Sequence, residues 1–109
     1  MKLLEFIDRV KKRPGMYLYG DNPLNSLEMM IYGYEVALKN HAIEGDLCNF
    51  RAEFNNYLFK ALGWSTSRGW SNAIVANTAS TEEATEIFFD LVGRFVLLKY
   101  GIKSSIYDG

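Results

Sequence analysis

Apolar residues recur along this chain every three or four positions, which is the spacing of amphipathic α-helices and not the alternation of β-strands. The spacing predicts four main helices at about residues 2–12, 26–42, 46–62 and 81–100. A shorter apolar segment at about 71–78 predicts either a short additional helix or, at Ile74 and Val75, a strand. We therefore expect an all-α fold, a compact single-domain bundle formed by residues 1–109.

The expected helix boundaries depend on capping residues and on proline. Pro14 is expected to end the first helix, because the residue before a proline is driven out of the helical range of backbone angles. Asn25 and Glu28 have the spacing of a capping box and predict the start of the second helix. Ser80 and Glu83 have the same spacing at the start of the last helix.

The second predicted helix contains an apolar row and one interior glycine. The apolar row predicts its core-facing side, which is formed by Leu27, Met30, Ile31, Tyr34 and Leu38. Glu35 lies four positions before Lys39, which predicts an ion pair on the surface. Gly33 costs up to about 1 kcal/mol relative to alanine. Either another helix approaches closely at this glycine, or it is a tolerated surface residue.

The charges of the chain are nearly balanced, with a formal net charge of -1 and a pI of about 5.8. A general nucleic-acid binder has a strongly basic surface, so this balance argues against one. The basic cluster of Arg9 and residues 11–13 lies at the end of a predicted helix, where cations interact favourably with the helix dipole. No apolar run approaches the roughly 18 residues of a membrane span. We expect a cytoplasmic protein that does not bind membranes.

Candidate catalytic residues are few. His41 and Cys48 are the only histidine and cysteine, and a dyad between them is conceivable. The break at Gly45-Asp46 separates them, so we expect His41 to contact carbonyl groups at a helix end and Cys48 to pack as a small apolar residue. Two such side chains are too few for a zinc site, and the sequence has no glycine-rich phosphate loop. We expect no enzyme activity, no cofactor and no metal.

A polar loop at residues 63–72 contains both tryptophans. We expect Trp64 and Trp70 to hold this loop on the core, with at least one of them buried. Arg68 lies in the middle of the loop. It is the candidate there for an exposed contact with a partner, because arginine is enriched at binding hot spots.

The segment Arg13-Pro14-Gly15-Met16-Tyr17 is a signature between the first two predicted helices. It resembles a segment near the start of the ATPase subunit of type II topoisomerases, in which the next helix carries a Glu-x-x-x-Asn pair. Glu35 and Asn40 do not reproduce that spacing, and the later glycine motifs of that family are absent from the sequence. We therefore interpret the signature as a shared turn and not as part of an ATPase.

The signature is expected to have a structural role in this chain. Met16, Tyr17 and Leu18 are expected to anchor the turn to the core. Arg13 is expected to be partly buried and paired with an acid from another helix.

The order of motifs over most of the chain resembles a group of small bacterial immunity proteins. The motifs are residues 13–18, Ser26-Leu27 with Gly33-Tyr34, Gly63-Trp64-Ser65, Gly69-Trp70 and the Glu-Glu-Ala of the last helix. This group belongs to contact-dependent growth inhibition and related polymorphic toxin systems. The resemblance implies a cytoplasmic protein that binds a cognate toxin domain, often a nuclease, and neutralises it by stoichiometric occlusion. It implies no direct binding of nucleic acid and no metal.

Toxin nucleases present basic clefts, so acidic patches on an inhibitor would be complementary to them and would speed association. On charge alone, with Arg68 of the loop added, the candidate partner-binding residues are Asp21, Glu28, Asp46, Glu53, Arg68, Glu83, Glu86 and Asp90. Two other functions stay open. One is a small nucleic-acid-binding module that uses the basic cluster of Arg9, Lys11, Lys12 and Arg13, and the other is a generic protein-interaction module.

Overall fold

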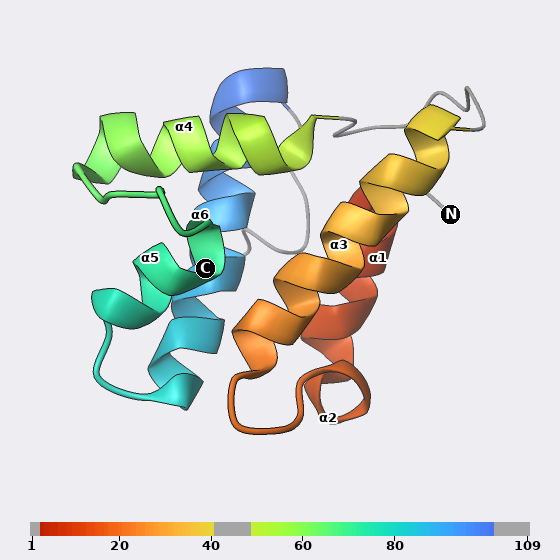
Figure 1. Cartoon of the computed structure of the whole chain (residues 1–109), viewed down its shortest axis with the longest axis vertical. Helices are drawn as coiled ribbons and strands as arrows, with labels where there is room; N and C mark the ends of the chain where they lie inside the picture. The colour runs from red at the N-terminus through yellow and green to blue at the C-terminus, as the bar shows by residue number, and fades with distance from the viewer. Residues whose placement is uncertain (1–2, 41–48, 102–109) are drawn as a thin grey trace.

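The computed structural model describes residues 3–40 and 49–101, and it describes the side chains of residues 3–37 and 49–101. The helices in these ranges are α1 (Leu3–Lys12), α2 (Pro14–Tyr17), α3 (Pro23–Asn40), α4 (Phe50–Leu62), α5 (Trp70–Ala76) and α6 (Thr81–Tyr100) (Figure 1). No strand occurs within the described ranges, which confirms the all-α fold. The alternative of a strand at Ile74 and Val75 is wrong, because both residues lie in α5.

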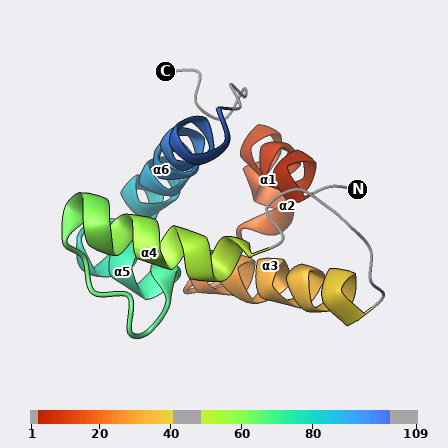
Figure 2. The ribbon, with the colours of Figure 1, turned by 90° about the horizontal axis from the view of Figure 1, so that it is seen from above.

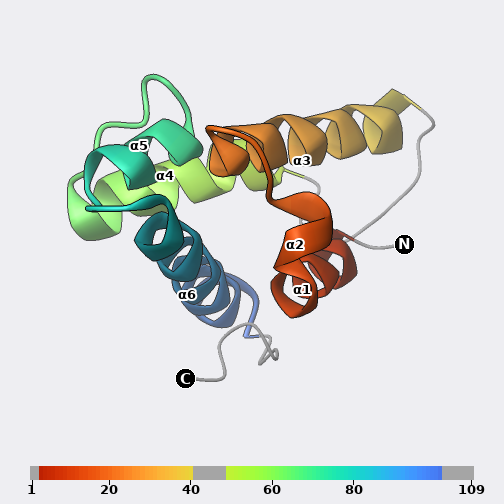
Figure 3. The ribbon, with the colours of Figure 1, turned by 90° about the horizontal axis from the view of Figure 1, so that it is seen from below.

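The helices form two groups. Figures 2 and 3, which view the molecule from opposite sides, both show α3, α4 and α5 together and α1 and α6 on the other side. The short helix α5 contacts three longer helices, α3, α4 and α6, and α6 also contacts α3 and α4. A short helix in contact with three long ones places its side chains at the centre of the molecule.

Aromatic side chains from three helices fill this centre. Trp70, at the start of α5, is fully buried and stacks on Phe88 of α6 with ring centroids 4.7 Å apart. Phe50 and Phe54 of α4 stack on each other at 4.9 Å and meet the Trp70 ring edge-on. The prediction that at least one tryptophan is buried is confirmed by Trp70, and Trp64 is half-buried against the same core.

The start of α6 is capped as the sequence predicts, and the start of α3 is not. At α6 the Ser80 hydroxyl accepts a hydrogen bond from the Glu83 backbone N–H at 3.1 Å. Helix α3 begins at Pro23, because proline suits the first helical position and the Asn22 side chain accepts from Asn25 N–H at 3.4 Å. The predicted capping box of Asn25 and Glu28 is therefore wrong.

The signature segment forms a helical turn of its own. Helix α1 ends at Lys12 as expected, and Pro14 is the first residue of α2. Tyr17 is half-buried and meets the Phe6 ring edge-on at 5.7 Å, but α2 has no buried residue. Arg13 is exposed and the Met16 side chain is 61% exposed. The predictions that Arg13 is partly buried and that Met16 anchors the turn to the core are wrong.

Some predictions concern residues outside the described part of the chain. They include the roles of His41 and Cys48, the candidate contact Asp46, and the side chain of Lys39. The helix predicted to begin at residue 46 is described from Phe50 onward. Within the described residues, every helix is too short or too polar to cross a membrane.

Candidate functional site

Helix α3 directs two carboxylates inward. Leu24, Leu27 and Ile31 are buried, and they share a helix face with Glu28 and Glu35, which are 2% and 4% exposed. The prediction that Glu28 is a surface contact for a partner does not fit this burial. The predicted pair between Glu35 and Lys39 is not tested, because the Lys39 side chain lies outside the described residues, but Glu35 itself is buried and not on the surface.

Glu28 joins α3 to the two neighbouring helices. Its Oε1 accepts hydrogen bonds from Ser71 of α5, at 3.2 Å from the backbone N–H and 2.5 Å from the hydroxyl. Its Oε2 lies 3.5 Å from Nε of Arg51 on α4. A buried carboxylate is tolerable only when it is paired and hydrogen-bonded, and Ser71 and Arg51 supply both conditions.

Arg51 is held on two other sides. Its backbone N–H donates to Oε1 of Glu35 at 2.8 Å, and its guanidinium lies over the Tyr32 ring, 4.9 Å from the ring centroid. Two carboxylates and one aromatic ring of α3 therefore fix the first turn of α4. We call the group of Glu28, Glu35, Arg51 and Ser71 the buried polar cluster, in which Arg51 reaches the surface with a side chain 42% exposed.

Gly69 completes the buried polar cluster from the loop before α5. Its φ of +93° is a conformation that L side chains rarely adopt, and the residue is buried. A Cβ atom at this position would lie 2.9 Å from Oε1 of Glu28 and closer still to Oε2. The loop between the tryptophans can approach α3 only because residue 69 has no side chain.

The outward face of α3 is largely apolar from Met29 to Ala37, and the Arg51 guanidinium borders it at Tyr32. Met29, Met30, Tyr32 and Val36 are 49%, 38%, 44% and 37% exposed, and the sequence prediction that Met30 faces the core is wrong. Gly33 lies among them on the surface, with nothing within 4 Å of the position a Cβ would take. No described part of this chain approaches Gly33, so its interpretation as an internal close-approach site is also wrong. We call Met29, Met30, Tyr32, Gly33, Val36 and Ala37 the outward α3 face.

Two of the predicted acidic contacts are already engaged within the chain. Glu53 of α4 is half-buried and accepts a hydrogen bond from the Tyr100 hydroxyl, while Nζ of Lys99 lies 3.7 Å from the same oxygen. Asp90 of α6 pairs with Arg94 one turn later, at 2.9 Å. Glu53 therefore links α4 to α6, whereas Asp90 forms a surface pair within one helix.

The other predicted contacts that the structure describes are exposed but dispersed. Glu83 and Glu86 lie on the surface of α6, Asp21 precedes α3, and Arg68 is exposed in the loop before α5. They therefore do not form one site. Within the described residues, His, Cys, Asp and Glu side chains form no group of three or more that could hold a metal ion.

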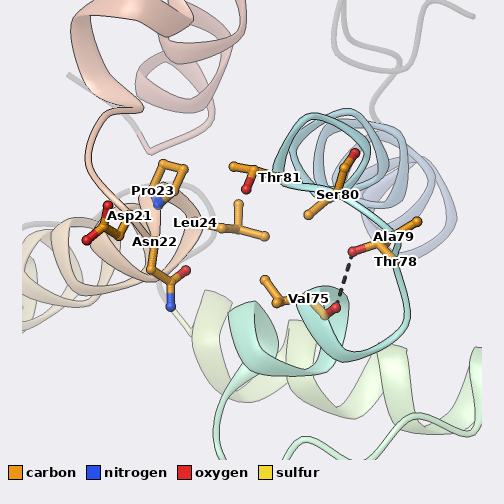
Figure 4. A pocket seen from close by; sticks show the side chains of 10 residues that line it. Asp21, Asn22, Pro23, Leu24, Val75, Thr78, Ala79, Ser80 and Thr81 are labelled. Atoms are coloured by element: carbon orange, nitrogen blue, oxygen red, sulfur yellow. Dashed lines mark hydrogen bonds between the residues drawn. The ribbon is translucent and has the colours of Figure 1, made fainter.

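A hollow of about 330 Å³ lies where α3 begins, α5 ends and α6 begins (Figure 4). Its lining includes Asp21, Leu24, Val75 and Ser80. Several polar groups there bond locally, because Ser80 caps α6 and the Thr78 hydroxyl donates to the carbonyl oxygens of Ile74 and Val75, at 3.0 and 3.3 Å. Another hollow of similar volume lies between α4 and α6. It is bordered by Leu98, the most exposed large apolar residue described.

A larger hollow of about 410 Å³ lies between the end of α1 and α2. It is lined by Arg9, Lys12, Arg13, Met16 and Tyr17, so three of its five lining residues are cationic. We call it the signature hollow. The sequence showed the basic cluster and the signature separately, but not that they border one cavity.

Comparison with known proteins does not place this chain in a family. No protein-family model, curated protein or solved structure matches it.

Proposed function

We propose that this chain is an immunity protein of the cytoplasm, which binds a cognate toxin domain and neutralises it by stoichiometric occlusion. The cognate domain is most simply a nuclease, because the order of motifs resembles immunity proteins of contact-dependent growth inhibition. The structural observation that carries the proposal is the outward α3 face, a largely apolar and exposed helix surface of the kind that protein partners cover.

Exposed apolar residues that are grouped on one surface mark binding sites more often than single exposed ones do. Methionine and tyrosine are among the residue types enriched in protein interfaces, whereas charged residues are depleted at interface centres. The outward α3 face has this composition, with Met29, Met30 and Tyr32 exposed and the one described charge beside them, Arg51, at the Tyr32 edge. Gly33 offers a place where the backbone of a partner can come close.

The buried polar cluster supports the same face from behind. Glu28 and Glu35 hold α3 against Arg51 and Ser71, so the outward side chains project from a helix fixed on two neighbours. A surface that is ordered before binding loses less conformational entropy in the complex, which favours tight association. Occlusion of an active site requires such a preformed surface.

The acidic residues of α6 supply a second element of the proposal. Glu82, Glu83 and Glu86 are exposed, and Asp90 continues the row beside Arg94. Negative charge on an inhibitor complements the basic cleft of a nuclease and mainly raises the association rate. We therefore assign binding energy to the outward α3 face and steering to α6.

Co-expression tests the proposal. Cells that produce the toxin domain encoded beside this gene should grow when this chain is produced and should not grow without it. Met30→Glu should abolish the rescue, because it places a charge within the proposed contact. Phe59→Glu is the matched control, since Phe59 is 60% exposed on α4, away from the outward α3 face, and this variant should still rescue. Absence of rescue by the unaltered chain contradicts the proposed function.

A further inference from the structure

The signature segment has no structural role that accounts for its arginine and methionine. Arg13 and Met16 are exposed, and α2 as a whole contributes no buried residue. Both side chains border the signature hollow, together with Arg9 and Lys12 from the last turn of α1. Arg13 and Met16 therefore border a cavity instead of packing in the core, whereas Tyr17 and Leu18 pack against the core.

The walls of the signature hollow are held by backbone hydrogen bonds. Arg13 N–H donates to the Arg9 carbonyl at 3.0 Å, Met16 N–H donates to the Arg13 carbonyl at 3.1 Å, and Leu18 N–H donates to the Pro14 carbonyl at 2.7 Å. These bonds fix the end of α1, the connecting residue Arg13 and α2 relative to one another. The edge-on contact of the half-buried Tyr17 with Phe6 holds the aromatic wall.

The charge of the signature hollow is not neutralised within the described chain. Lys12 pairs with Asp8 at 3.0 Å, but no carboxylate of the described residues lies within ion-pair distance of Arg9 or Arg13. Two arginines four residues apart therefore border one cavity without a counter-ion from the described residues. Arginine presents a planar fork of N–H donors that matches the oxygens of a phosphate group.

We propose that the signature hollow binds the phosphate group of a small phosphorylated molecule. Arg9 and Arg13 hold the phosphate oxygens, and the less polar part of the ligand lies on Met16 and Tyr17. The volume of about 410 Å³ is within the range of small-ligand pockets, which is roughly 300–1,000 Å³. This site is independent of the proposed toxin contact, because it lies on α1 and α2 rather than on the outward α3 face.

The charge distribution favours a small ligand over a nucleic acid. A polynucleotide needs a basic stripe along which several phosphates can be neutralised. This chain has a formal net charge of -1 and exposes a row of acids on α6. A single phosphate meets the two arginines without approaching those acids.

Titration of the full chain at low ionic strength tests the site, with AMP, inorganic phosphate, adenosine and a twelve-nucleotide single-stranded RNA as probes. We expect AMP to bind, inorganic phosphate to bind more weakly, and adenosine not to bind. Shifts of the Tyr17 and Arg13 backbone amide signals in a ¹H–¹⁵N spectrum would locate the ligand. Raising the salt from about 20 to about 200 mM should weaken the binding of AMP, because exposed charges are screened.

Two double variants distinguish binding of AMP at this site from a general attraction of AMP to the cations of the protein. The double change Arg9→Gln and Arg13→Gln should weaken AMP binding at least about tenfold, since it removes two charge-assisted contacts. The matched control, Lys60→Gln with Arg94→Gln, removes two exposed cations from α4 and α6 and should change the affinity less than about twofold. All four side chains are exposed, so each variant should keep the thermal stability of the parent to within a few degrees.

Several results would overturn the proposal. They are the absence of AMP binding at low salt, an equal loss of affinity in the control variant, and inorganic phosphate binding as tightly as AMP. Binding of the RNA without binding of AMP would indicate a polynucleotide surface instead. None of these results would affect the rescue test, so the two proposals fail separately.

Discussion

Replacing Gly69 by alanine tests the packing of the buried polar cluster. The new methyl group would lie 2.9 Å from Oε1 of Glu28 and closer to Oε2. Real Cβ atoms do not remain at such distances, so the carboxylate has to move. Its movement would break the hydrogen bonds from Ser71 and separate it from Arg51.

The expected cost has two parts. Gly69 has φ 93° and ψ 164°, a region that is essentially restricted to glycine, and a side chain there costs about 1–3 kcal/mol. Loss of a hydrogen bond to a buried charged group costs about 1.5–3 kcal/mol. We expect Gly69→Ala to lower the free energy of unfolding by about 3–5 kcal/mol. With an m value of about 1.5 kcal/mol/M, the midpoint in urea should fall by at least about 2 M.

Gly20→Ala is the matched control. Gly20 also has a positive φ, of +88°, but it is exposed and nothing lies within 4 Å of its Cβ position. This substitution should cost only the backbone part, about 1–2 kcal/mol. A cost of Gly69→Ala well above that of Gly20→Ala would point to the contact with Glu28.

A double-mutant cycle completes this test. In a Glu28→Ala background the new methyl group has room, so Gly69→Ala should cost about 2 kcal/mol less than in the parent, because residues in contact are not additive. Urea unfolding followed by tryptophan fluorescence measures all four proteins. Equal costs for Gly69→Ala and Gly20→Ala, or an additive cycle, would refute the close approach of Gly69 and Glu28.

Three further substitutions test the capping, the core and the contact between α4 and α6. Ser80→Ala should destabilise the protein by about 1 kcal/mol through loss of the α6 cap, lowering Tm in a thermal melt by about 4–8 °C; an unchanged Tm would mean that the cap is unimportant. Phe54→Ala should cost about 3–5 kcal/mol in urea unfolding, because the ring is fully buried against Phe50 and Trp70, and a cost below about 1 kcal/mol is incompatible with that packing. Tyr100→Phe should cost about 0.5–1.5 kcal/mol by removing the hydroxyl that donates to Glu53, and a neutral result would show that this bond does not hold α6 to α4.

Local signals in the sequence predicted much of the secondary structure. Helical spacing located the long helices, and the capping residue Ser80 placed the start of α6 at Thr81. Trp70 was recognised as a candidate core anchor because a large aromatic residue in a small helical protein contributes much buried area. Helical spacing and capping depend on residues that are close together in the chain, so a single sequence is enough to recognise them.

The orientation of α3 could not be predicted in the same way. Glu28 and Glu35 are in phase with Leu24, Leu27 and Ile31, so the spacing allowed them to be buried. Burial of a carboxylate requires partners, however, and these come from α4 and α5. Without those partners, the apolar Met30 was the more reasonable choice for the interior. The exposed apolar residues of the outward α3 face were missed for the same reason.

The signature hollow shows a similar limit. The sequence identified Arg13-Pro14-Gly15-Met16-Tyr17 as a turn and the basic cluster as a helix end, and both descriptions hold. The turn was expected to pack inward because methionine and tyrosine are apolar. A four-residue helix has few side chains that can face the core, and α2 leaves its methionine in solvent.

The most direct test of the proposed function is a calorimetric titration of this chain with the toxin domain that the proposal expects to be encoded beside it, purified in a catalytically inactive form. We predict a one-to-one complex, a loss of affinity of at least about a hundredfold for Met30→Glu, and an affinity for Phe59→Glu within about threefold of the parent. A parent chain that shows no heat of binding and no complex by gel filtration would contradict the proposed function. A complex that Met30→Glu leaves intact would show that the toxin covers a face other than the outward α3 face.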